Sequence, residues 1–121
     1  MKKTKHGDYE KMVTFPVFSK YRVHLIFAKD IHKSLDVRYG DTSRHGDADA
    51  FCRHSKDGHT HIFMPFGVTD NTIAHECWHA VFEMFDYVAA GLDNESVAYH
   101  LGYLVEQVYD FKRKVQHVSK N

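Results

Sequence analysis

Residues 69–91 read TDNTIAHECWHAVFEMFDYVAAG, and this stretch decides the fold expected for the chain. Thr69 is a common helix-capping residue, and Gly91 is a residue at which helices commonly stop. Between them, apolar side chains recur three and four residues apart, at Ala74, Trp78, Val81, Phe85 and Val88. This spacing predicts an amphipathic helix from about Asn71 to Ala89.

Within this helix, residues 75–79 read His-Glu-Cys-Trp-His and match the pattern HExxH. Residues four apart lie on one helix face, so both imidazoles can reach one metal ion while Glu76 flanks it. A zinc ion in such a site lowers the pKa of bound water, and the glutamate takes the proton of that water. The spacing therefore predicts zinc ligands at His75 and His79 and a general base at Glu76, although two histidines that only form hydrogen bonds are the alternative.

A catalytic zinc ion needs a third protein ligand and an open fourth position. Glu83 shares the helix face of the two histidines, but residues 75 to 83 span about 12 Å of helix axis, too far for one ion. Cys77 lies two residues from each histidine and points away from both. The third ligand is therefore expected outside this helix.

The best candidate for the third ligand is Glu95. Residues 91–94 are just long enough to turn the chain back into an antiparallel helix that begins near Glu95. The alternative is a first-turn carboxylate that only interacts favourably with the helix dipole. Asp93 and Glu106 are weaker substitutes as ligands.

The rest of the chain predicts one α+β domain over residues 1–121, with antiparallel strands before the HExxH helix. Asp30 can cap a short helix that reaches Tyr39, and apolar spacing predicts a last helix over about Asn94–Val118. Asp57-Gly58 is a tight-turn signal between the last two predicted strands. Strands are predicted at Met12–Phe18, Tyr21–Ala28, Asp47–His54 and His59–Pro65, which are rich in β-branched and aromatic residues.

The composition is that of an ordinary globular protein. Sixteen basic residues balance sixteen acidic ones, which argues against a nucleic-acid partner despite the basic cluster at 112–114. No apolar run is long enough to span a membrane, and the basic start has no apolar segment of a signal peptide behind it. The two cysteines fit free thiols in a reducing cytoplasm better than a disulfide framework.

An HExxH helix followed by a helix that carries Glu-Ser-Val-Ala-Tyr at 95–99 resembles the gluzincin arrangement, especially minigluzincins and ImmA/IrrE-like peptidases. Residues 47–106 are also similar to small zinc-peptidase-like proteins encoded by phages and prophages. The resemblance implies a zincin-like fold, Zn²⁺ held by His75, His79 and Glu95, and hydrolysis of a peptide or protein substrate. It further implies the cytoplasm of a bacterial host, if the chain is phage-encoded. The second lobe of large gluzincins is missing, so the cleft is expected to be shallow or completed by a partner.

Several residues could support such a site. Tyr99 and Tyr103, one and two turns after Glu95, could stabilise an oxyanion, with His100 to one side; packing tyrosines are the alternative. Glu83 or Asp86 could accept a hydrogen bond from a zinc-bound histidine, or could simply form a solvated helix face.

The strands before the HExxH helix carry two further expectations. His59 and His61 share a strand face, so they could bind a metal or line the site, although a hairpin surface is the plainer interpretation. In the families that the chain resembles, the strand before the HExxH helix pairs with extended substrate. That role would fall to Asp47–His54 or His59–Pro65.

A different class of function also fits the sequence. A catalytically inactive protein of the same fold could bind a host or phage protein, with or without zinc. The sequence indicates neither the oligomeric state nor the cleavage specificity.

Overall fold

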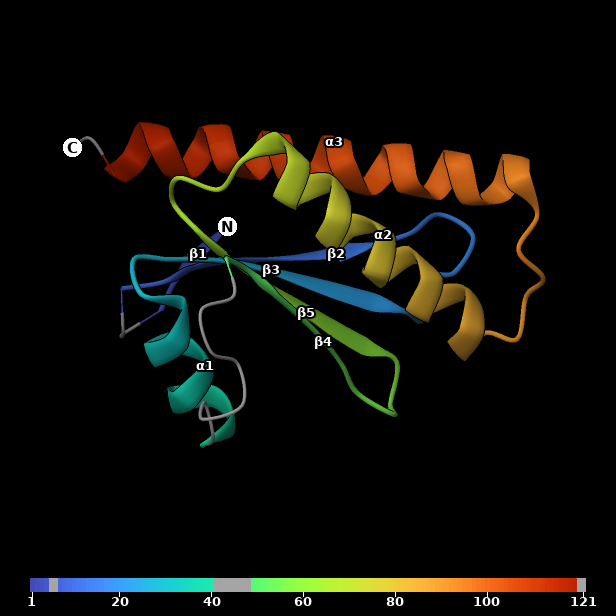
Figure 1. Cartoon of the computed structure of the whole chain (residues 1–121), viewed down its shortest axis with the longest axis horizontal. Coiled ribbons are helices and arrows are strands. Elements are labelled where there is room, and N and C mark those ends of the chain that lie inside the picture. The colour runs from blue at the N-terminus through green and yellow to red at the C-terminus, as the bar shows by residue number, and fades with distance from the viewer. Residues whose placement is uncertain (5–6, 41–48, 120–121) are drawn as a thin grey trace.

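A computed structural model of the chain describes residues 1–4, 7–40 and 49–119. Over these residues the chain forms five strands and three helices. In chain order they are β1 (Lys2–Lys3), β2 (Tyr9–Thr14), β3 (Arg22–Ala28), α1 (Ile31–Tyr39), β4 (Phe51–His54), β5 (His59–Pro65), α2 (Asp70–Tyr87) and α3 (Asn94–Ser119). The strands form one sheet, with α1 against one face and α2 and α3 over the other (Figure 1). The chain is therefore an α+β protein, as the sequence predicts.

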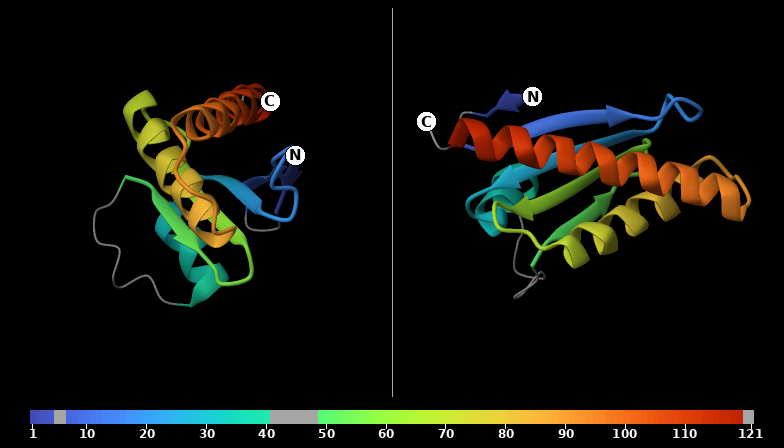
Figure 2. Two further views of the ribbon diagram at one scale, coloured as in Figure 1. Left: turned by 90° about the vertical axis from the view of Figure 1, so that its right-hand side faces the viewer. Right: turned by 90° about the horizontal axis from the view of Figure 1, so that it is seen from above.

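The sheet has the strand order β1-β2-β3-β5-β4, and three of its four pairings are antiparallel. The exception is the parallel pair β3 and β5, in which Arg22 lies opposite His59 and Ala28 opposite Pro65. An entirely antiparallel set of strands was therefore the wrong expectation. The reason is that parallel neighbours need a crossover, and α1 supplies it on one face of the sheet (Figure 2). As a result β5 lies inside the sheet, and β4 is an edge strand.

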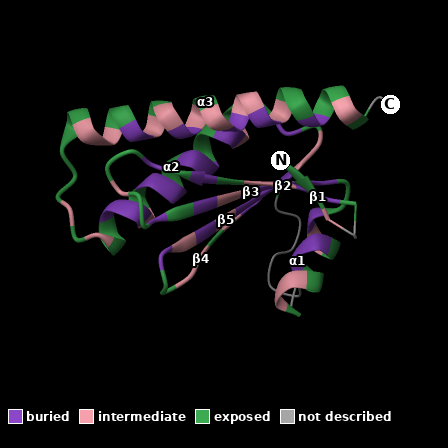
Figure 3. Ribbon diagram, turned by 180° about the vertical axis from the view of Figure 1, so that it is seen from behind, coloured by how far each residue is buried: buried purple, intermediate pink, exposed green. Residues whose placement is uncertain are grey.

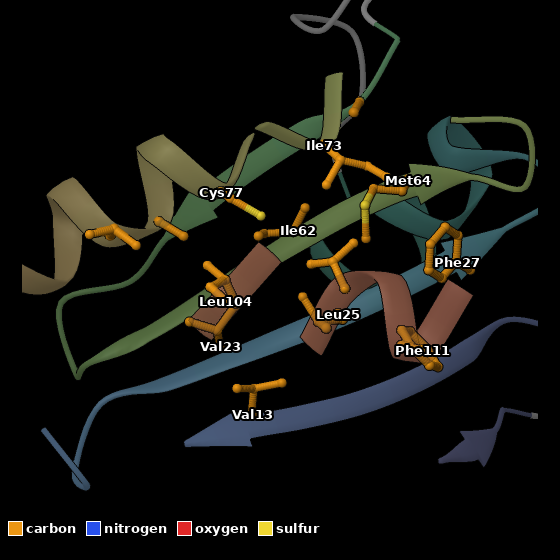
Figure 4. Close-up of a cluster of buried hydrophobic side chains, with 14 of the residues drawn as sticks. Val13, Val23, Leu25, Phe27, Ile62, Met64, Ile73, Cys77, Leu104 and Phe111 are labelled. Carbon is orange, nitrogen blue, oxygen red and sulfur yellow. The ribbon is translucent and has the colours of Figure 1, made fainter. Parts of the chain in front are cut away.

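The larger hydrophobic core lies between the sheet and the pair α2–α3 (Figure 4). Val23, Leu25 and Phe27 alternate along β3 and so point to the same side of the sheet. The helices cover them with Ile73, Cys77, Leu104 and Phe111, among others. Burial of this apolar surface favours folding and fixes α2 over the sheet.

A smaller core lies on the opposite face, where α1 packs on the sheet. Ile26 and Phe63 from the strands meet Ile31 and Leu35 from α1, and all four are buried. The predicted ends of α1 are confirmed. The Asp30 carboxylate accepts a hydrogen bond from the Lys33 amide at 3.1 Å, and Gly40 ends the helix with φ of 76°.

The buried face of α2 differs from the predicted apolar stripe. Val81 and Phe85 are buried, but Ala74 is exposed and Trp78 is 42% exposed. The buried positions of the helix are Ile73, Glu76, Cys77, Ala80, Val81, Met84 and Phe85. Apolar residues occupy more than half of the circumference of α2, so their spacing alone did not indicate which side the sheet would cover.

The last helix agrees with its prediction. Asp93 precedes α3, and its side chain accepts a hydrogen bond from the Ser96 amide at 3.2 Å. Leu104, Val108, Phe111 and Val115 are buried against the rest of the protein, and the opposite face of α3 is exposed (Figure 3). No helix within the described residues is long and apolar enough to cross a membrane.

Candidate metal centre

His75 and His79 lie side by side on the exposed surface of α2. Their Nε2 atoms are 3.1 Å apart, and the side chain of His75 is 66% exposed. The regular helix between Thr69 and Tyr87 produces this pairing, because residues four apart project from adjacent turns. Both ring nitrogens therefore face the same small volume, as the HExxH spacing predicts.

Glu76 occupies a different environment from its two neighbours. The residue is only 7% exposed, and its Oε2 atom is buried without a hydrogen-bond partner among the described residues. Its Oε1 atom lies 4.0 Å from Nε2 of His75. Burial raises the pKa of Glu76 above its usual value, and the imidazoles of His75 and His79 oppose that shift. A buried carboxylate without a partner, beside two imidazoles, is suited to taking up a proton.

Glu76 borders a cleft of about 390 Å³ between α2 and the edge strand β4. Glu76, His79 and Glu83 line it from α2, residues 50–54 line it from the strand side, and Leu35 of α1 borders it as well. Cys52 also borders the cleft, and burial raises the pKa of its thiol, so the thiol stays protonated near neutral pH. The charged and titratable groups that line the cleft are therefore the carboxylates of Glu76 and Glu83, the imidazoles of His54 and His79 and the guanidinium of Arg53.

Glu95 is not brought to the histidine pair. The helices α2 and α3 run antiparallel, with the Tyr109 hydroxyl donating to the Asp70 carboxylate at 2.6 Å and the rings of Phe85 and His100 5.5 Å apart. Glu95 lies in the first turn of α3, five residues before His100, and is exposed.

Along α2, the histidine pair lies between Asp70 and Phe85, two residues through which this helix contacts α3, but on a different side of the helix. His79 lines the cleft towards β4, whereas α3 contacts another side of α2 through Phe85. Throughout the described ranges, no three His, Cys, Asp or Glu side chains form a group able to hold a metal ion. The role of Glu95 as the third zinc ligand therefore stays a prediction.

The two tyrosines expected near the site lie on α3, away from the cleft. The Tyr103 hydroxyl donates to the carbonyl oxygen of Thr14 at 3.1 Å, and its ring packs on Phe15. Tyr99 is 57% exposed. His100 is buried against Phe18, and its Nδ1 lies 2.7 Å from the carbonyl oxygen of Ser96. Its Nε2 is buried without a hydrogen-bond partner among the described residues, and the residue does not line the cleft. Neither tyrosine borders the cleft that holds Glu76.

His59 and His61 lie on the α1 face of the sheet and do not line the α2 site. The ring of His61 stacks on His24 of β3 with centroids 4.4 Å apart, and it also contacts Tyr39 of α1. Nε2 of His24 lies 2.8 Å from Nδ1 of His59. β5 does form a hairpin with β4, as the plainer interpretation supposes, and both histidines are partly exposed on that face of the sheet.

Sequence reasoning missed His54, which lines the cleft from β4. Nδ1 of His54 lies 3.0 Å from the hydroxyl of the buried Tyr21, and its Nε2 lies 3.9 Å from Oε2 of Glu83. In the sequence, His54 is only the last residue before a tight turn. No local signal could place it opposite α2, because that contact depends on the order of the strands.

Comparison with known proteins yields no match for this chain. No family model matches it, and neither does any curated protein or solved structure.

Proposed function

We propose that the protein is a small zincin-like metallopeptidase, in which His75 and His79 hold Zn²⁺ and Glu76 is the general base. The observation that carries this proposal is the pair of Nε2 atoms 3.1 Å apart beside the buried Glu76 carboxylate, whose Oε2 atom has no hydrogen-bond partner among the described residues. Two imidazoles that converge at this distance suit one shared ion, since zinc binds histidine nitrogen at about 2 Å.

In the proposed hydrolysis the two histidines hold the zinc, and Glu76 transfers the proton. Zinc, when bound, would polarise the substrate carbonyl and make water more acidic. Glu76 takes a proton from the attacking water, which then adds to the carbonyl carbon. Glu76 next returns that proton to the amine nitrogen as the C–N bond breaks. Its burial suits the first step, because burial raises the pKa of the carboxyl group and so makes the carboxylate a stronger base.

The proposed substrate is an extended segment of a protein. β4 is the edge of the sheet, so its outer backbone groups can pair with an added strand. A segment bound there would run past the cleft that contains Glu76 and His79. Of the two strands considered from the sequence, the strand ending at His54 takes this role, because β5 already has neighbours on both sides. Because both cysteines are free thiols, we propose that the protein acts in the cytoplasm. For a phage-encoded chain, this is the cytoplasm of the bacterial host.

The deciding experiment combines metal content with a peptide-library digest. We expect the wild type to retain close to one zinc per chain and to cleave peptides. Glu76→Gln should keep the zinc but lose activity by about 10³-fold or more, since it removes the general base. Asp36→Asn, an exposed carboxylate-to-amide change on α1, is the matched control and should be fully active. Absence of zinc from the wild type would refute the metal site, and full activity of Glu76→Gln would refute the mechanism.

The third ligand needs a separate test. Glu95 can join the histidine pair only if the first turn of α3 moves towards it. We expect Glu95→Gln to weaken zinc binding more than Glu83→Gln does, because a direct ligand contributes more to affinity than a carboxylate that only hydrogen-bonds to a ligand. The opposite order in a chelator competition would assign the third position to a residue of the cleft.

One observation favours the alternative of a catalytically inactive binding protein. Trp78 and Phe82 are each 42% exposed, and their rings lie 6.1 Å apart on α2, beside the histidine pair. Exposed aromatic residues of this kind are common at protein interfaces. If the wild type cleaves nothing and a host or phage protein binds it stoichiometrically, with Trp78→Ala abolishing binding, the binding function is the correct one.

A further inference from the structure

His54 closes the cleft on the side opposite the HExxH helix. It is the last residue of the edge strand β4 and pairs with Thr60 of β5. Its imidazole borders the same cleft as Glu76, His79 and Glu83, so it faces the place where the proposed zinc site would act on a peptide.

The Nδ1 side of His54 is held by two hydroxyl groups. The Tyr21 hydroxyl lies 3.0 Å from Nδ1 and also contacts the Thr60 hydroxyl, which lies 3.3 Å from Nδ1. Tyr21 is completely buried, and its ring stacks on His54 with an interplanar angle of 15°. The ring of Tyr87 on α2 adds an edge contact. The imidazole is therefore fixed in orientation by packing as well as by hydrogen bonds.

This hydroxyl pair accommodates His54 in either of two protonation states. When the ring is neutral, Tyr21 can donate to Nδ1 and accept from Thr60. When the ring is protonated, Nδ1–H can donate to Tyr21, which then donates to Thr60. In both of these arrangements Nε2 carries a hydrogen. The remaining form, a neutral ring protonated at Nδ1, would turn a lone pair of Nε2 towards the Glu83 carboxylate, which only accepts hydrogen bonds, so the carboxylate favours the forms in which Nε2 is a donor.

The Nε2 donor has a charged neighbour but no close partner in the described residues. Oε2 of Glu83 lies 3.9 Å away, which is within ion-pair range and beyond hydrogen-bond length. The nearby carboxylate orients the N–H towards the cleft and leaves it free for a ligand atom. A carbonyl oxygen of a peptide paired with β4 is a ligand atom of the required kind.

We propose that His54 donates a hydrogen bond from Nε2 to the carbonyl oxygen of a peptide bound along β4 and stabilises the oxyanion that forms there. His54 keeps its proton throughout, and Tyr21 and Glu83 are the positioning residues that orient its ring. This inference rests on the proposed function. It assigns to β4 the role that the sequence suggested for Tyr99 and Tyr103.

The test separates a donor from a metal ligand and from a packing residue. We expect His54→Ala to lower kcat by about 10²–10³-fold, the usual effect of removing one oxyanion donor, with KM changed little and zinc fully retained. His54→Gln keeps an N–H donor and should recover part of kcat. Tyr21→Phe should lower kcat less than His54→Ala, because it only loosens the ring. His59→Ala, on the other face of the sheet, is the control and should behave as wild type.

Other outcomes would overturn the assignment. Wild-type kcat in a folded His54→Ala variant would exclude the donor, and loss of zinc from that variant would make His54 a ligand instead. If the wild type cleaves nothing, the proposed function fails, and binding of a pool of random phosphinic hexapeptides tests His54 separately. Weaker binding by His54→Ala would support the donor, whereas equal binding, or none by either protein, would overturn it.

Discussion

Histidines gather in two regions of this protein, and the two groups differ in almost every physical respect. On α2, His75 and His79 are exposed, and their Nε2 atoms face each other at 3.1 Å beside the buried Glu76. On the opposite side of the sheet, His24 and His61 are stacked with an interplanar angle of 9°, and Nδ1 of His61 is buried without a hydrogen-bond partner among the described residues.

The difference follows from secondary structure. Side chains four apart on a helix can converge on one point above the surface, whereas opposite residues of adjacent strands leave the sheet in parallel and lie ring on ring. His24 and His61 are such a pair in the register of β3 and β5. A high histidine content therefore says little about metal binding, and the spacing of the histidines within one element says much more.

The largest expected contrast between the two regions is in zinc affinity. His79→Ala should weaken zinc binding on the order of 10³-fold or more, because even the loss of a group that only hydrogen-bonds to a ligand costs about 10–100-fold. His59→Ala in the stacked group should change zinc affinity by less than about twofold, because His59 lies outside the site. Chelator competition on both variants measures this. Equal losses would mean that the two regions share an ion and that the contrast is false.

The next contrast concerns the cores on the two faces of the sheet. Phe111 is fully buried, and its ring lies 5.1 Å from Phe27 in the larger core. Phe111→Ala should lower the free energy of unfolding by about 3–5 kcal/mol. Leu35→Ala in the smaller core should cost about 2–3 kcal/mol, at the low end for such changes, because the thin layer under α1 can relax. Urea denaturation of both variants gives the comparison, and a larger loss for Leu35→Ala would reverse it.

A pH-dependent difference should come from the stacked group. Burial and the neighbouring His24 lower the pKa of His61 to about 4, below its unfolded value near 6.5. The unfolded chain therefore binds this proton first, and stability present above pH 6.5 is lost as the pH falls towards 4. His61→Phe should reduce this loss.

The measurement is urea denaturation at pH 7 and pH 5 in the presence of a chelator. Removal of metal is needed because metal binding is itself pH-dependent and would add to the change in stability. An unchanged pH dependence in His61→Phe would show that other groups control the acid sensitivity.

The smallest expected effect is at the helix caps on the two faces. Asp30→Ala removes the acceptor for the Lys33 amide in α1, and Thr69→Ala removes the acceptor for the Thr72 amide in α2. Each should cost about 1 kcal/mol of stability, a usual value for loss of an N-cap. Thermal unfolding resolves such changes. Because α2 also carries the histidine pair, only Thr69→Ala should alter zinc affinity, and an equal change in both variants would contradict this.

Much of the local structure could be predicted because it depends on neighbouring residues. The capped helix α1 between Asp30 and Gly40, the hairpin around Asp57-Gly58 and the helices α2 and α3 follow from cap residues, turn residues and apolar spacing. The placement of Glu95 and of His54 could not be predicted in the same way. Both depend on which side of α2 meets α3 and which strand forms the edge of the sheet.

The sequence by itself determined that His75 and His79 would face one point with Glu76 between them, because the pitch of a helix makes any i, i+4 pair adjacent. Only the tertiary structure decided that Glu76 is buried in a cleft and that His54 lies across from it. Those contacts join α2 to a strand that pairs with β5, and β5 pairs in turn with β3. They come from packing between elements far apart in the chain, which the spacing of residues within one element cannot specify.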